Sequence, residues 1–87
     1  MKFKQSSDIH SKKIGSEIVL LELDKKHIRQ LNSTASFLWE QLKEKKTTNE
    51  LALNLSTKFK ISKNEAIKDI DSWIKDYLEQ GFLQQIK

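Results

Sequence analysis

Histidines, paired carboxylates and hydroxyl side chains are the groups in this sequence that could do acid–base or nucleophilic chemistry. The chain has two histidines, His10 and His27, which lie in different segments, and it has no cysteine. Without cysteine there are no disulfides, thiolate metal sites or cysteine nucleophiles. Asp69 and Asp71 are two positions apart in a helical segment, so their side chains point in different directions and form no acid–base pair. We therefore expect no catalytic residues and no metal site.

The motifs that hold phosphates or activate nucleophiles are also missing from the sequence. Gly15 and Gly81 are the only glycines, so no glycine-rich phosphate loop exists, and there is neither an H-E-x-x-H nor a G-x-S-x-G pattern. A length of 87 residues permits one domain, which we expect to span residues 1–87. These features favour a binding module without a cofactor over an enzyme.

The net charge of +4 makes nucleic acid a partner to consider. The excess lies in residues 1–46, which carry ten basic and six acidic side chains, whereas residues 62–80 carry three lysines and five acidic side chains. No apolar run approaches the roughly 18 residues of a membrane span, and the polar start is unlike a signal peptide. We expect a cytoplasmic protein that binds no membrane.

Short strands are predicted before Asn32. Residues 16–23 are rich in apolar and β-branched side chains, with Gly15 as a turn before them. Residues 24–26 form a polar turn, and residues 27–31 give a second strand, so this region reads as a β-hairpin. Residues 9–14 offer a third strand. The first few residues either pair with another strand or are frayed.

Three helices are predicted after Asn32, and each begins with a capping signal. Asn32 and the two residues after it are cap candidates for the first helix, which places Trp39 in the core. Residues 47–50 and 62–65 fit the S/T-x-x-E capping box that opens the second and third helices. Gly81 stands where the third helix needs a left-handed residue to end. The fold class is therefore α+β, an N-terminal antiparallel sheet of two or three strands followed by three helices.

The strand at residues 27–31 is expected at the edge of this small sheet, with one row of main-chain N–H and C=O groups unpaired. It is either an ordinary guarded edge or a docking edge to which an extended peptide adds as a strand. The third helix is more apolar than one core stripe requires. Either a single wide stripe packs in the core, or Trp73 and Tyr77 line a groove beside the edge strand, where aromatic rings with polar tips are well suited.

Three stretches of the chain together resemble the PqqD-like family. Residues 28–39, IRQLNSTASFLW, resemble its strand-to-helix junction, in which Leu-Asn ends a strand and a helix with Ala and Trp follows. Residues 46–51 resemble its turn into the second helix, although lysine stands here where glycine is usual. Residues 66–74, followed by Gly-Phe-Leu at 81–83, resemble its closing helix. The resemblance covers about residues 16–84, and the order and spacing of the motifs are more specific than any one of them.

The resemblance implies a winged-helix-like fold and a role as a recognition element for ribosomally made peptide natural products. Such domains bind the leader of a precursor peptide as an added strand between their third strand and third helix. Standalone members present it to a modifying enzyme or leader peptidase, such as a radical-SAM maturase or a transglutaminase-like protease, and this chain looks closest to the lasso-peptide type. Carried over by position, the peptide-binding candidates are Ile28, Arg29, Gln30, Leu31, Asp69, Ile70, Trp73, Ile74 and Tyr77, some of which must belong to the core.

A winged-helix nucleic-acid-binding protein is the alternative. A recognition helix normally brings Lys and Arg to phosphates and base edges, and the acidic third helix of this chain does not fit that role. We therefore expect a peptide partner and no nucleic acid.

Overall fold

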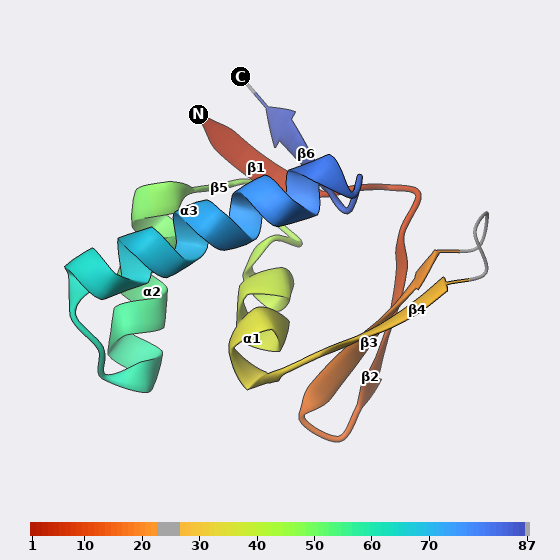
Figure 1. The fold of residues 1–87 in the computed structure, drawn as a ribbon, viewed down its shortest axis with the longest axis horizontal. Helices are drawn as coiled ribbons and strands as arrows, with labels where there is room; N and C mark the ends of the chain where they lie inside the picture. Colours follow the sequence, from red (N-terminus) through yellow and green to blue (C-terminus); the bar gives the residue numbers. More distant parts are fainter. Residues whose placement is uncertain (23–26, 87) are drawn as a thin grey trace.

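A three-stranded antiparallel sheet forms one side of the molecule (Figure 1). The computed structural model describes residues 1–22 and 27–86. The sheet has the order β2-β3-β4, from β2 (His10–Ile14), β3 (Glu17–Glu22) and β4 (His27–Leu31). Gly15, at φ +64°, and Ser16 form the two-residue loop between β2 and β3. The predicted strands, including the third one, are confirmed, whereas the turn predicted at residues 24–26 lies outside the described residues.

Three helices follow β4: α1 (Ser33–Gln41), α2 (Thr48–Phe59) and α3 (Lys63–Glu79). The Asn32 side chain caps α1 by accepting from the backbone N–H of Ala35 at 2.8 Å. Thr47 and Glu50 form the full reciprocal capping box at α2, and the Ser62 hydroxyl accepts from the backbone N–H of Glu65 at α3. The predicted starts of these helices are confirmed. They could be predicted from the sequence because each cap depends on contacts over only three residues.

The C-terminal end of α3 is set by Gly81, which has a φ of +80°. The Gly81 N–H donates to the carbonyl of Leu78 at 3.1 Å, and the Phe82 N–H donates to the carbonyl of Tyr77 at 2.9 Å. These are the two hydrogen bonds of a Schellman motif. The chain therefore reverses after α3 and folds Phe82 back against Tyr77.

A second antiparallel sheet joins the two ends of the chain and was not predicted as such. Its order is β5-β1-β6, from β1 (Lys2–Gln5), β5 (Lys46–Thr47) and β6 (Leu83–Ile86). Lys2 pairs with Ile86, which places the N- and C-terminal strands side by side (Figure 1). Of the two possibilities for the first residues, pairing is therefore the one that occurs. The fold is α+β as expected, with a strand after the last helix as well.

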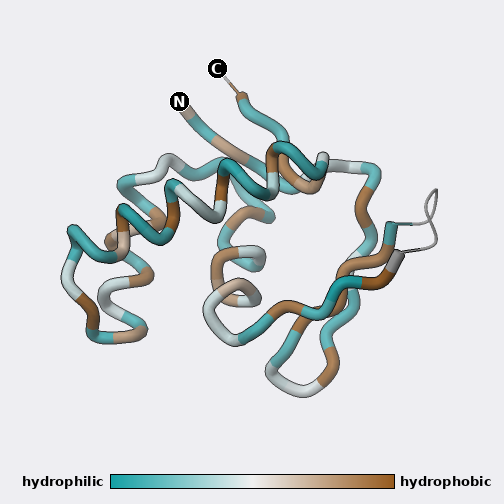
Figure 2. The backbone as a smooth tube through the Cα atoms, viewed as in Figure 1, coloured by the Kyte–Doolittle hydropathy of each residue, from teal (hydrophilic) through white to brown (hydrophobic). Residues whose placement is uncertain are grey.

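The hydrophobic core of the described residues lies between the helices and the two sheets, with Phe3 of β1 and Leu83 of β6 contributed by the second sheet. Hydrophobic positions recur at helical spacing along α3 (Figure 2), and it is the same stripe that is buried. Trp39 is fully buried, as predicted. The largest fully buried side chains are Trp39, Phe82, Leu20, Leu31, Leu38, Leu42, Leu51, Leu55 and Ile70. None of the helices in the described residues combines the length and the apolar character that crossing a membrane requires.

Candidate functional site

Strand β4 forms one edge of the first sheet, because β3 is its only partner in the described part of the chain. The two-residue loop before β3 makes Ile14 and Glu17 a hydrogen-bonded pair. Since hydrogen-bonded and non-hydrogen-bonded pairs alternate, the main-chain groups of Ile18 and Leu20 point towards β4. The register then turns the N–H and C=O groups of Ile28 and Gln30 away from β3, to the free edge.

Ser36 supports this assignment independently. The backbone N–H of Ile18 donates to the Ser36 hydroxyl at 3.1 Å, and that hydroxyl donates to the carbonyl of Leu31 at 3.2 Å. The two backbone groups face one another across the β3–β4 pair, and the hydroxyl bridges them. Ser36 is buried on α1, so this bridge also holds the end of β4 against the helix.

The side chains of β4 alternate between the two faces of the sheet. Leu31 is only 2% exposed, and Arg29 points to the same side. Ile28, 72% exposed, and Gln30 point to the outer side, where the Gln30 amide donates to Glu17 at 3.2 Å. A strand added at this edge would therefore have one row of side chains facing Arg29 and the other facing solvent.

Arg29 links β4 to the C-terminal half of α3. Its guanidinium donates to Gln80 Oε1 at 2.5 Å and to Asp76 Oδ2 at 3.3 Å. The guanidinium carbon also lies 5.0 Å from the ring centroid of Tyr77 and 5.5 Å from that of Phe82, within range of a cation–π interaction. The side chain of Arg29 keeps 38% of its surface exposed, so it is reachable from solvent.

Trp73, Tyr77 and Phe82 form an aromatic cluster beneath Arg29. The Trp73 and Tyr77 ring centroids are 4.2 Å apart, and those of Tyr77 and Phe82 are 5.3 Å apart. Burial raises the pKa of Tyr77 above 10.0, while the positive charge of Arg29 opposes that shift. Trp73 is half-buried, and its indole nitrogen lies on the buried side of the ring. The cluster therefore offers apolar ring surface beside the guanidinium of Arg29.

The structure sorts the nine candidate residues into core and accessible positions. Leu31, Ile70, Ile74 and Tyr77 are buried, with exposed fractions of 2%, 0%, 5% and 3%. The accessible or partly accessible candidates are Ile28, Arg29, Gln30, Asp69 and Trp73. The guanidinium of Arg29 lies over the ring of Tyr77, and the Tyr77 ring in turn packs against the ring of Trp73. Asp69 is exposed one helical turn before Trp73.

Sequence reasoning missed three members of this arrangement. Asp76 and Gln80 bind the guanidinium of Arg29, and Phe82 completes the aromatic cluster. Asp76 and Gln80 stand 47 and 51 positions from Arg29, so no local pattern pairs them with it. A helical projection would have shown that both share the face of α3 that carries Trp73.

Strand β2 forms the opposite edge of the same sheet and differs in chemistry. All five of its residues are exposed, and Lys12 and Lys13 stand in its middle. Lysines on an edge strand discourage pairing with another chain. At β4, Arg29 is folded down onto α3 instead. No group of three His, Asp or Glu side chains placed to hold a metal ion occurs among residues 1–22 and 27–86.

Comparison with known proteins places the chain in a family. The family model for coenzyme PQQ synthesis protein D (PqqD) matches residues 17–83. The chain belongs to the PqqD family. The matched span runs from the start of β3 to the start of β6, so it includes β4, α3 and the contacts between them.

Two solved structures share the fold of this PqqD-family chain. One is described as TbiB1 in complex with the TbiA(beta) leader peptide, with a TM-score of 0.87 and 21% identity over 97% of this chain and 98% of that one. The other is a lasso peptide synthetase B1 complexed with the leader peptide, with a TM-score of 0.85 and 21% identity over 98% of this chain and 100% of that one. No curated protein matches the sequence significantly. The expected family and fold class are thus confirmed.

Proposed function

We propose that this PqqD-family chain binds the leader segment of a ribosomally made precursor peptide as an additional strand on the free edge of β4, beside α3. The observation that carries the proposal is an unpaired edge at Ile28 and Gln30 next to the partly open aromatic cluster under Arg29. The two structures with the same fold are described as leader-peptide complexes, which supports the same class of ligand here.

Strand addition accounts for how so small a domain would hold a flexible peptide. Main-chain hydrogen bonds at the edge supply affinity for any extended segment, and side-chain contacts select among segments. Each such bond contributes about 0.5–1.5 kcal/mol net, so several are needed to offset the cost of ordering the peptide. The ring surface of Trp73 and the guanidinium of Arg29 supply the side-chain contacts on the inner face.

In this proposal the chain carries out no reaction itself. It presents the core segment of the precursor to a modifying enzyme or a leader peptidase, and a radical-SAM maturase or a transglutaminase-like protease is the expected kind of partner. The chain's own contribution is to raise the local concentration of the substrate at that enzyme. A single domain over residues 1–87, as the sequence predicts, would suit an adaptor of this kind.

An NMR titration tests the proposal. Short reading frames near this chain's gene are first searched for a precursor; the probe is a synthetic peptide with the leader sequence of that precursor, and a scrambled peptide is its control. We expect the largest amide shifts at Ile28, Gln30 and residues 66–77. Replacing Trp73 by Ala should weaken binding while the fold survives, whereas Lys75→Ala, on an exposed position of the same helix, should leave it unchanged. No shift at saturating peptide would end the proposal.

A winged-helix nucleic-acid-binding protein is the second candidate, and the net charge of +4 is the observation in its favour. Three exposed lysines of α3 are interleaved with five exposed acidic side chains, which weakens this reading. Salt-dependent binding of duplex DNA in a gel-shift assay at micromolar protein would establish it.

A further inference from the structure

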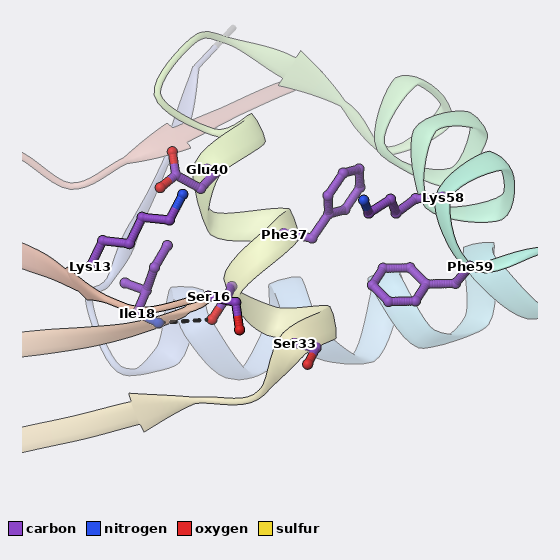
Figure 3. Close-up of a pocket in the computed structure, with 9 residues that line it drawn as sticks. Lys13, Ser16, Ile18, Ser33, Phe37, Glu40, Lys58 and Phe59 are labelled. Carbon is purple, nitrogen blue, oxygen red and sulfur yellow. Dashed lines mark hydrogen bonds between the residues drawn. The ribbon is translucent and has the colours of Figure 1, made fainter.

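A hollow of about 310 Å³ lies on the molecule away from the free edge of β4. Helix α1 forms its floor, the tip of the β2–β3 hairpin lies on one side, and the C-terminal end of α2 lies on the other (Figure 3). Its lining residues come from β2, β3, α1, α2 and the loop before β3, and the hollow approaches β4 only at its end, where Ser36 bonds to the carbonyl of Leu31. A ligand in this hollow would leave the proposed leader site open.

Aromatic rings give the hollow an apolar interior. Phe37 on α1 and Phe59 at the end of α2 meet edge to face, with ring centroids 5.8 Å apart at 86°. Both are only half-buried, and Ile18 of β3 closes the interior from the sheet side. Two partly exposed phenylalanines around one cavity provide a seat for a further large apolar side chain.

Two lysines stand over this apolar interior. Lys13 comes from β2 and Lys58 from α2, so they approach the hollow from opposite sides (Figure 3). Neither forms an ion pair with any residue in the described ranges. Glu40, the acidic side chain of the lining, is paired with Lys43 at 2.8 Å. The hollow therefore presents two lysines that form no ion pair around an apolar seat, with the carboxylate of Glu40 in the same lining.

We propose that this hollow docks an acidic segment of the partner protein that receives the peptide, with one large apolar side chain of that segment seated between Phe37 and Phe59. The identity of the partner as the receiving enzyme rests on the proposed function; the chemistry of the segment rests on the charges and rings of the hollow. An apolar anchor in a pocket supplies affinity, and the surrounding charges supply orientation and selectivity. Leader and partner would then occupy opposite sides of β3 at the same time.

The probe for the test is a short synthetic peptide with one Phe flanked by Asp and Glu, titrated into the isotope-labelled chain. Two matched peptides serve as controls, one with Lys in place of the acidic residues and one with Ala in place of Phe. We expect amide and methyl shifts around Ile18, Phe37 and Phe59 with the first peptide, and much weaker ones with either control. Added salt should weaken binding, since exposed charges are screened within about 8 Å at physiological ionic strength.

Charge reversal locates the site. Lys13→Glu combined with Lys58→Glu should weaken binding of the acidic peptide at least about tenfold, because two attractions become repulsions. Lys12→Glu combined with Lys45→Glu makes the same change in net charge on exposed lysines outside the hollow and should have little effect. The milder pair Lys13→Gln with Lys58→Gln should fall between these two variants. Leader-peptide affinity should be equal in all of them.

Several outcomes would overturn the proposal. One is equal binding of the acidic and basic peptides. A second is amide shifts at Ile28 and Gln30 in place of Phe37 and Phe59. A third is an equal loss of peptide affinity in the two charge-reversed variants, inside and outside the hollow. Shifts around the hollow that depend on protein concentration without any peptide would make a second copy of the chain its occupant. Loss of leader binding with intact docking of the acidic peptide would count against the proposed function alone.

Discussion

Gln30→Pro tests which main-chain groups of β4 receive the leader peptide. The N–H of Gln30 points away from β3, so proline at this position removes a donor that the isolated chain does not use. Proline is tolerated on an edge strand whose N–H faces solvent, and the preceding residue is already extended, as proline requires. We expect the free energy of unfolding to change by no more than about 1 kcal/mol.

The expected loss of leader affinity follows from the missing hydrogen bond. One net main-chain bond contributes about 0.5–1.5 kcal/mol, which corresponds to roughly 2- to 12-fold in the dissociation constant. The proline ring also stands where the carbonyl of an added strand would approach, so the measured loss should reach the upper end of that range or exceed it. Calorimetric titration with the leader peptide gives the affinity, and urea unfolding gives the stability.

Two controls separate the backbone effect from others. Gln30→Ala keeps the N–H and loses only the side chain with its exposed contact to Glu17, so it should bind the leader like the unaltered chain. Arg29→Pro removes a backbone N–H that faces Leu20, a buried residue of β3. Relative to Arg29→Ala, which keeps that N–H, it should lower the free energy of unfolding by about 1–3 kcal/mol. Equal leader affinity in Gln30→Pro and Gln30→Ala would refute strand addition at this edge. Equal destabilisation by the two prolines would refute the assignment of inward and outward groups.

Three further predictions concern stability, and urea unfolding checks each of them. Ser36→Ala removes the hydroxyl that the backbone N–H of Ile18 and the carbonyl of Leu31 share, and it should lower the free energy of unfolding by about 2–4 kcal/mol. Ser33→Ala, at an exposed position of the same helix, should lower it by less than about 0.5 kcal/mol. Gly81→Ala should cost about 1–2 kcal/mol from the positive φ alone, since an added Cβ meets nothing within 4 Å; no loss would contradict the role of that conformation. Hydrogen bonds from the backbone and then the side chain of Thr47 lower the pKa of Glu50 from 4.5. The contribution of the Glu50 carboxylate to the free energy of unfolding is therefore present above pH 4.5 and is lost as the pH falls through the lowered pKa. Glu50→Gln keeps an acceptor but does not titrate, so the stability of this variant relative to the unaltered chain should rise on acidification.

Local features of this fold were predictable because their causes lie within a few residues. The capping box of Thr47 and Glu50 needs a spacing of three, and the stop at Gly81 needs one residue that accepts a positive φ. The second sheet was not predictable in this way. Its long ladder joins Lys2 to Ile86, and nothing in either short segment specifies the other as its partner. Pairing of this kind depends on the helices bringing the two ends of the chain together.

The candidate site divides along the same line. The sequence by itself determined an edge strand ending in Leu31, an amphipathic third helix with Trp73 and Tyr77, and motifs that resemble the PqqD family. Helical spacing shows which residues share a face, but not which face meets the core. Only the tertiary structure decided that Tyr77 is buried while Trp73 stays partly open. The tertiary structure also placed Arg29 against Asp76 of α3 and over the ring of Tyr77. These side chains are nearly fifty residues apart in the sequence, so their contact depends on the packing of the whole domain.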